Sequence, residues 1–297
     1  MHHREGTFLG AGNLPLYYQA WHPSDVRATF VIVHGLGAHS SRHDTVVQAL
    51  VPKGYGVYAF DLRGHGRSPG QRAYINAWSE FRQDLDCFLA LVQNRHGNLP
   101  CFLLGHSLGA MIVLDYVLRT PRPLQGVIVS SLPIDNSIPP LQKLLGNLLS
   151  KIWPRFTLRS GLDPCLGSRD QTVMEELLTD PLRHYQGTAR MVTEFSKTAE
   201  WVLEHASNLQ TPLLMMHGGG DRIALPSSSQ AFFEQATFAN KEYYLYPESY
   251  HDLYIDINYP EVLADLVAWL EQQLAAGLVA TSPSLVEGEQ CCGEGAK

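Results

Sequence analysis

The chain has 297 residues, of which 45% are hydrophobic and 17% are charged, and its formal net charge at pH 7 is −7. This composition is typical of a globular protein with a sizeable core, and the length allows one large or two ordinary domains. An acidic chain without clustered Lys and Arg is a poor partner for nucleic acid, and it would not bind anionic lipid through charge alone.

Short apolar runs alternate along the chain with longer segments of helical periodicity. Strands are predicted at residues 28–34, 56–61, 101–104, 126–129, 212–216 and 242–246. Helices are predicted at residues 41–53, 79–95, 108–119, 227–236 and 261–274. Strands that are apolar throughout and separated by helices are typical of a parallel sheet covered on both faces. We therefore expect an α/β fold, with a mostly parallel central sheet built from residues 1–131 and 211–275.

Residues 132–210 break this alternation, and we expect them to form an inserted helical cap without strands of its own. Six apolar residues in this segment have the spacing of one helix face. They are Leu141, Leu144, Leu145, Leu148, Leu149 and Ile152. Such a stripe is typical of a helix packed on a core. The alternative is a lid whose apolar face, including Leu145 and Leu149, lines a lipid entrance or contacts a membrane transiently.

Three features bear on the location of the protein. The first residues lack the long apolar stretch of a secretory signal, and no apolar run reaches the roughly 20 residues of a membrane-spanning helix. The cysteines are odd in number, match no metal-binding spacing, and are Cys87, Cys101, Cys165, Cys291 and Cys292. We expect a cytoplasmic protein without a disulfide framework, or one held peripherally at a membrane. Residues 276–297 are small, polar and acidic, so we expect a disordered tail.

The segment Gly105-His106-Ser107-Leu108-Gly109 fits the pattern G-x-S-x-G. It follows a predicted strand and opens a predicted helix, which is the context in which this pattern marks a nucleophilic serine. The turn is so tight that side chains at the two glycines would collide with neighbouring backbone. We therefore predict that Ser107 is a nucleophile; the alternative is an ordinary turn serine.

A serine hydroxyl needs a base to take its proton and an acid to orient that base, in the chain order Ser, Asp or Glu, His. Asp221 comes shortly after the predicted strand 212–216, and His251 shortly after 242–246. Because carboxyl ends of parallel strands meet at one sheet edge, we expect the triad Ser107, Asp221 and His251.

Two other acidic residues compete with Asp221 for the role of the acid. Asp135 follows the predicted strand 126–129. Asp252 is adjacent to the histidine, and a neighbouring residue does not easily reach the ring nitrogen that faces away from the serine.

Several other histidines lie near the same sheet edge. We interpret His34 and His106 as structural or pocket-lining side chains. His39 and His43 are four residues apart, but no third ligand falls nearby, so we expect no metal site.

Acyl transfer develops an oxyanion, which backbone N–H groups stabilise. We expect one donor at Leu108, directly after the nucleophile, and the other at Leu36, in the glycine-rich loop after the first long strand. The competing interpretation of that loop is phosphate binding, but it lacks the lysine and the spacing of a P-loop.

Seven stretches of the chain carry recognisable patterns. They are VHGLGAHSSRH from Val33, FDLRGHGRSPGQR from Phe60, FLLGHSLGA from Phe102, GLDPCLGSRD from Gly161, DPLRH from Asp180, HGGGDRI from His217 and YHDLY from Tyr250. With them the sequence resembles the α/β-hydrolase superfamily and, within it, the monoacylglycerol lipase and lysophospholipase-like serine hydrolases.

This resemblance implies an α/β-hydrolase fold, the triad given above, and a mobile apolar cap over an acyl tunnel. It also implies that a lipid carboxylic ester is hydrolysed. Arg42 matches an arginine with which the family recognises the glycerol end of its substrate, and His106, Leu145 and Leu149 are further candidates for substrate contact. Ala38 stands where the family has an acidic residue, and His43 where it has a tyrosine, so the preferred head group stays open.

The sequence therefore predicts a serine hydrolase that forms an acyl-enzyme and needs no metal or organic cofactor. The substrate expected first is monoacylglycerol. The alternatives are a general carboxylesterase, a lysophospholipase or an acyltransferase on the same triad, and a ligand-binding homologue that does not turn over.

Overall fold

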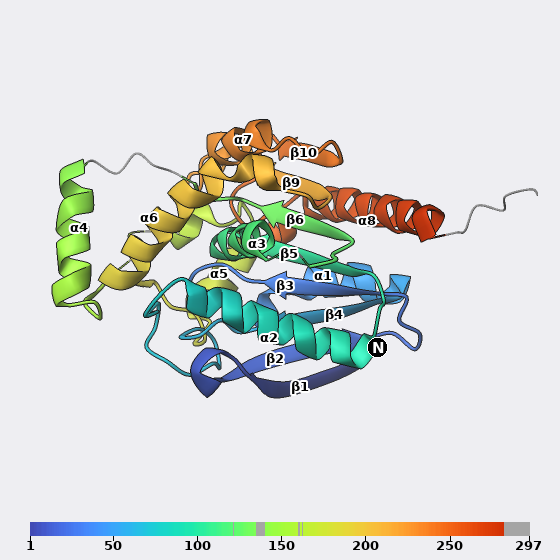
Figure 1. Ribbon diagram of the computed structural model, residues 1–297, viewed down its shortest axis with the longest axis horizontal. Helices are drawn as coiled ribbons and strands as arrows, with labels where there is room; N and C mark the ends of the chain where they lie inside the picture. Colours follow the sequence, from blue (N-terminus) through green and yellow to red (C-terminus); the bar gives the residue numbers. More distant parts are fainter. Residues whose placement is uncertain (121, 135–139, 160, 162, 282–297) are drawn as a thin grey trace, which may run out of the picture.

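The structure, a computed structural model, describes residues 1–120, 122–134, 140–159, 161 and 163–281. Its centre is an eight-stranded sheet in the order β1-β2-β4-β3-β5-β6-β9-β10 (Figure 1). The strands are β1 (His2–Leu9), β2 (Pro15–His22), β3 (Ala28–Val33), β4 (Tyr55–Phe60), β5 (Cys101–His106), β6 (Gly126–Ser130), β9 (Leu213–Gly218) and β10 (Lys241–Tyr246). All pairs from β4 to β10 are parallel, so the predicted mostly parallel sheet is confirmed.

The two antiparallel strands β1 and β2 are missing from the sequence-based prediction. Strand β1 lies at the sheet edge and is mostly exposed, and β2 lies between β1 and β4. An exposed edge strand needs no continuous apolar run, which is the pattern that identified the buried strands.

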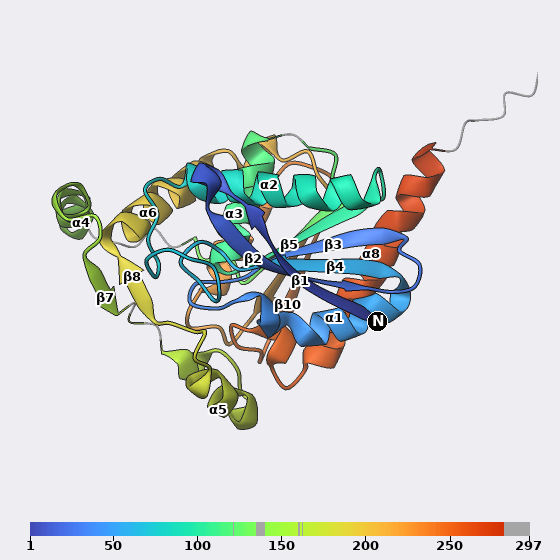
Figure 2. The ribbon, with the colours of Figure 1, turned by 90° about the horizontal axis from the view of Figure 1, so that it is seen from below.

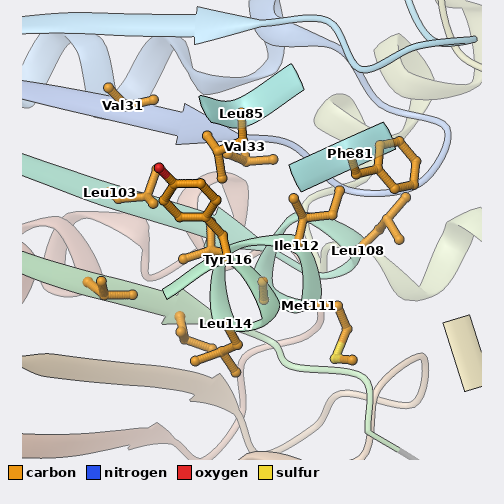
Figure 3. Packing of buried hydrophobic residues seen from close by; sticks show 14 of the residues in the cluster. Val31, Val33, Phe81, Leu85, Leu103, Leu108, Met111, Ile112, Leu114 and Tyr116 are labelled. Atoms are coloured by element: carbon orange, nitrogen blue, oxygen red, sulfur yellow. The ribbon is translucent and has the colours of Figure 1, made fainter. Parts of the chain in front are cut away.

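Helices cover both faces of the sheet. One face packs against α2 (Ser79–His96), α3 (Leu108–Arg119), α6 (Ala189–Glu204) and α7 (Pro226–Gln235). The opposite face packs against α1 (Asp44–Leu50) and α8 (Tyr259–Thr281). Figure 3 shows how Ile112 and Tyr116 of α3 lie among side chains of the strands and of α2. The expected α/β architecture is therefore confirmed.

Two helix predictions differ from the structure. The helix expected at residues 41–53 is split into a 3-10 turn, α1 and a second 3-10 turn, which ends where Gly54 takes a left-handed φ of 88°. The last helix, α8, continues to Thr281, so residues 276–281 are not part of a disordered tail. Residues 282–297 lie outside the described residues. The 3-10 helices are η1 (Ala11–Asn13), η2 (Ser40–His43), η3 (Val51–Lys53), η4 (Pro164–Leu166), η5 (Ala206–Asn208) and η6 (Leu253–Ile255).

The segment between β6 and β9 contains helices and, contrary to expectation, two short strands. Its elements are α4 (Pro140–Ile152), β7 (Thr157–Arg159), α5 (Gln171–Thr179), β8 (Gln186–Thr188) and α6. Strands β7 and β8 form a separate antiparallel pair, and three residues are too few to show a period of two in the sequence. Both views place α4 at the outer margin, against α6 and away from the central sheet (Figures 1 and 2). None of the helices in the described residues is both long and apolar enough to span a bilayer.

The packing of α3 gives a direct test of the core. Ile112 is completely buried, whereas the side chain of Ile257 is 61% exposed. We expect Ile112→Ala to lower the free energy of unfolding by about 2–5 kcal/mol, because it removes buried methyl groups and leaves a cavity. The control Ile257→Ala should change it by less than about 0.5 kcal/mol. Urea denaturation of both variants measures the difference, and equal losses would contradict the assigned core.

Candidate active site

Ser107 lies in a tight turn between the end of β5 and the start of α3. Its backbone has φ 54° and ψ −117°, a conformation that non-glycine residues rarely adopt. A Cβ atom on Gly105 would lie 2.4 Å from the carbonyl oxygen of Gly109, and one on Gly109 would lie 2.0 Å from that of Val33. Neither glycine can therefore be replaced without moving backbone, which is the constraint predicted for this turn.

His251 and Asp221 are hydrogen-bonded to each other at the same edge of the sheet. Asp221 follows β9 and His251 follows β10, and His251 Nδ1 lies 2.7 Å from Asp221 Oδ2. The other carboxylate oxygen, Oδ1, accepts hydrogen bonds from the N–H groups of Ile223 and Ala224 at 2.8 and 2.9 Å. Both side chains are buried, so the carboxylate holds the imidazole ring in one orientation.

The electrostatics of this pair favour a charged imidazolium. Burial alone would raise the pKa of Asp221, but the hydrogen bonds from His217 and His251 hold that pKa far below its usual value. Burial would likewise lower the pKa of His251, but the hydrogen bond and the charge of Asp221, with the charge of Asp252, raise it above its usual value. A base with these neighbours can take a proton and be stabilised once it has done so.

Ser107 and His251 line one cavity of about 60 Å³. Leu36, from the loop after β3, lines the same cavity. The segment between β6 and β9 contributes further lining residues, which are Asp163, Pro164, Gly167, Arg183, His184 and Tyr185. The structure therefore brings the predicted serine, histidine and glycine-rich loop together, and adds side chains that the sequence analysis did not single out.

The two expected oxyanion donors lie beside Ser107. Leu108 is the first residue of α3, where a helix leaves its N–H groups without an intrahelical partner. Neither the N–H of Leu108 nor that of Leu36 donates a hydrogen bond to any acceptor in the described residues. The loop that carries Leu36 approaches the serine closely, since a Cβ on Gly35 would lie 3.1 Å from Ser107 Cβ. Such free donors next to a nucleophile can stabilise a developing oxyanion.

His106 lines the cavity beside Ser107, whereas Arg42 and the two cap leucines do not. Arg42, Ala38, His43 and His106 line a second cavity of about 30 Å³. Leu145 and Leu149 line neither cavity, and the side chain of Leu145 is 56% exposed on α4.

The other acidic and histidine candidates have different surroundings. Asp135 lies outside the described residues. His39 pairs through Nε2 with Asp180 Oδ2 at 2.7 Å, and Arg42 Nη1 lies 4.0 Å from the same oxygen.

One contact that the sequence analysis missed joins His106 to Asp252. His106 Nε2 lies 2.8 Å from Asp252 Oδ1, so this carboxylate bonds to His106. The two side chains and His251 form a group of three potential metal ligands within the described residues. Ligands about 2.1 Å from a tetrahedral zinc ion lie roughly 3.4 Å apart, however, and the hydrogen bond already holds two of these atoms closer together.

The chain matches a known family and several known proteins. The family model described as serine aminopeptidase, S33, matches residues 24–258. A monoacylglycerol lipase of Mycolicibacterium smegmatis is 30% identical over 277 residues, which cover 91% of this chain and 98% of that protein. The human monoglyceride lipase is 27% identical, with 90% of each chain covered.

A solved structure gives the same result in three dimensions. The crystal structure of the monoacylglycerol lipase of Paleococcus ferrophilus has a TM-score of 0.79 and 30% sequence identity, and the match covers 87% of this chain and 99% of that one. The resemblance inferred from the sequence motifs is therefore confirmed: the chain belongs to the serine aminopeptidase S33 family of α/β hydrolases, in its monoacylglycerol lipase-like group.

Proposed function

We propose that this protein hydrolyses the ester bond of monoacylglycerols, with Ser107 as nucleophile, His251 as base and Asp221 as the acid that orients it. The observation that carries this proposal is the shared cavity of Ser107 and His251, where Asp221 holds the histidine ring at 2.7 Å. The substrate is taken from relatives named monoacylglycerol lipase that match nearly the whole chain.

In the first half of the reaction, His251 Nε2 takes the proton of the Ser107 hydroxyl, and Oγ attacks the ester carbonyl. The N–H groups of Leu36 and Leu108 stabilise the negative charge on the former carbonyl oxygen. The imidazolium is stabilised by Asp221, and it returns the proton to the leaving glycerol oxygen as the ester bond breaks.

In the second half, water replaces glycerol beside His251. The histidine takes a proton from this water, whose oxygen attacks the acyl-enzyme carbonyl, and it then protonates Ser107 Oγ as the fatty acid leaves. The scheme needs only this chain's own residues, a substrate ester and water.

Lysophospholipids are the second candidate substrates, and Arg183 favours them. This side chain lines both cavities, and its guanidinium group lies over the ring of Tyr185, 5.6 Å from the ring centroid. Within the described residues its Nε has no hydrogen-bond partner, and the group forms no ion pair with a carboxylate. An unpaired guanidinium is suited to a phosphate group. One relative is named for action on phospholipids: phospholipase YtpA of Bacillus subtilis, which is 26% identical over 258 residues. A general carboxylesterase or an acyltransferase would use the same side chains of Ser107, His251 and Asp221.

We further propose that residues 132–210 act as a cap over the core formed by residues 1–131 and 211–275, and that α4 contacts membranes. The support is a set of large apolar side chains on and after α4 that are more than half exposed. They are Leu144, Leu145, Leu148, Ile152 and Trp153. Helices with such a face lie in the interface of a bilayer.

We also propose a cytoplasmic location, in which the membrane contact would be peripheral. The free thiols of Cys87, Cys101 and Cys165 fit a reducing compartment.

The first prediction concerns the nucleophile and the head group. Fatty-acid release should be measured from monoacylglycerol, lysophosphatidylcholine, diacylglycerol and a methyl ester with one acyl chain, for wild type and Ser107→Ala. We expect monoacylglycerol to be preferred and Ser107→Ala to lose at least about 10³-fold in kcat, because no other hydroxyl replaces the nucleophile. Turnover retained by a folded Ser107→Ala protein would refute the proposed function. Preference for the lysophospholipid would support the second candidate.

The second prediction concerns the acid. In Asp221→Asn the imidazole loses its negative partner and its fixed tautomer, so we expect kcat to fall by about 10³–10⁴-fold. Asp25→Asn, an exposed change of the same kind, should keep wild-type kcat. Steady-state kinetics on a soluble ester measure both. If Asp221→Asn kept more than a tenth of the wild-type kcat, another carboxylate would have to be the acid.

The third prediction concerns the membrane. Leu148→Glu with Ile152→Glu places two charges on the exposed face of α4, and we expect binding to neutral phosphatidylcholine vesicles to fall at least about tenfold. Hydrolysis of a soluble short-chain ester should be unaffected. Leu9→Glu changes an apolar side chain that is 60% exposed on β1 and should leave vesicle binding unchanged. Co-sedimentation distinguishes these results, and equal binding by all three proteins would exclude α4 as the contact.

A further inference from the structure

The residues next to the proposed nucleophile and the proposed base are hydrogen-bonded to each other. His106 immediately precedes Ser107, and Asp252 immediately follows His251. His106 Nε2 and Asp252 Oδ1 lie 2.8 Å apart, so the turn after β5 and the loop after β10 are joined one residue away from each of the two reacting side chains.

Further contacts hold this junction in place. The rings of His106 and His251 lie against each other, with centroids 4.9 Å apart and planes inclined by 55°. The N–H of Asp252 donates to the carbonyl oxygen of Gly167 at 2.8 Å, and Ser131 Oγ donates to the carbonyl oxygen of His251 at 2.7 Å. The loop that carries His251 is thus held by contacts with His106 of β5, with Ser131 after β6 and with Gly167 in the segment between β6 and β9.

We propose that His106 and Asp252 are a positioning pair for the hydrolytic reaction: the pair aligns the serine turn with the histidine loop, and its carboxylate is a second negative charge beside the imidazolium of His251. This inference rests on the proposed function, because it assumes that His251 takes the proton of Ser107. It gives a role to a carboxylate that stands next to the base but does not orient it.

The charge state of the pair follows from its surroundings. Burial lowers the pKa of His106 below its usual value in spite of the hydrogen bond that it donates to Asp252, so the ring is neutral near pH 7. Burial opposes ionisation of Asp252, but the hydrogen bond that His106 donates, together with the charges of His251 and Arg183, holds the pKa of Asp252 far below its usual value. Nε2–H of His106 therefore donates to an ionised Asp252, while Nδ1 lies 3.3 Å from Ser130 Oγ.

A neutral partner leaves the negative charge of Asp252 available to His251. One ring nitrogen of His251 and one carboxylate oxygen of Asp252 lie within 4.8 Å of each other. Opposite charges at that separation in a site sheltered from water attract each other, so this carboxylate favours the protonated form of His251. Asp221 and Asp252 favour protonation of His251, whereas burial and the charge of Arg183 oppose it. The ring of His106, which lies against His251, is neutral. His43 is a further neutral ring in the field of Asp252.

Asp252→Asn tests the charge separately from the contact. The amide oxygen can still accept the hydrogen bond of His106, but the negative charge is gone. His251 then gives up its proton more readily, so the acid limb of the kcat/KM profile should move to lower pH by about half a unit to one unit. The imidazolium formed during the reaction is less stabilised, so kcat should fall about three- to tenfold.

Glu248→Gln is the matched control. It removes a carboxylate from the same loop, but this side chain is 88% exposed and pairs with Arg169. We expect its profile to coincide with that of wild type. If the Asp252→Asn profile also coincides with wild type in both the acid limb and kcat, the proposal is overturned.

His106→Asn tests the alignment and covers the case in which Asp252→Asn does not fold. This variant breaks the junction but keeps the charge of Asp252, so kcat should fall while the acid limb does not move to lower pH. A shift to lower pH, or an unchanged kcat, would contradict the proposed division of roles.

The same variants should be measured by the pH dependence of Ser107 labelling with a fluorophosphonate. Labelling requires the deprotonated base but no knowledge of the natural substrate. A shifted acid limb in Asp252→Asn labelling supports the positioning pair even if no tested lipid ester is turned over. Labelling that persists in Ser107→Ala refutes the proposed function instead, and so the two failures are distinguishable.

Discussion

The candidate site depends on the close approach of two backbone segments, the turn after β5 and the end of β3. The Cα atoms of Gly105 and Gly109 face carbonyl oxygens so closely that no side chain fits at either position. This contact forces Ser107 into a left-handed conformation that costs of the order of 1–3 kcal/mol. The buried face of α3 offsets that cost, because Leu108, Met111 and Ile112, which follow the serine, belong to the core (Figure 3).

The second constraint is electrostatic, because the site holds one buried and one partly buried carboxylate, both ionised, at the end of an apolar sheet. Asp221 is tolerated there since two backbone N–H groups and two histidines donate to it. Asp252 is tolerated through His106. Both charges are in place before any substrate arrives, and groups that are oriented in advance need no reorganisation when the imidazolium forms. The same hydrogen bonds that satisfy buried charges therefore prepare the histidine for its proposed role.

The parts predicted from the sequence are those that local patterns determine. Continuous apolar runs identified the six parallel strands, and the glycines around Ser107 identified the turn. Strand β1 was missed because it is exposed, and β7 and β8 because they are short. Strand β2 is mostly buried, but the polar Gln19 interrupts its apolar run. The bond between His106 and Asp252 was missed for a different reason: it depends on how two distant loops meet, and the adjacency of Asp252 to His251 counted only against its being the acid.

The inserted segment combines two surfaces of opposite character, and the structure separates them. The part of the segment that contains Asp180 and His184 is bound to the core. The N–H of His184 donates to the carbonyl oxygen of Gly37, and Asp180 pairs with His39. That part supplies the polar wall beside Ser107. Helix α4 contacts α6 instead and exposes its apolar face at the margin of the molecule (Figure 2). Under the proposed function, α4 can change its contacts with a lipid surface without disturbing the polar wall, because none of the described residues that line the cavity beside Ser107 belongs to α4.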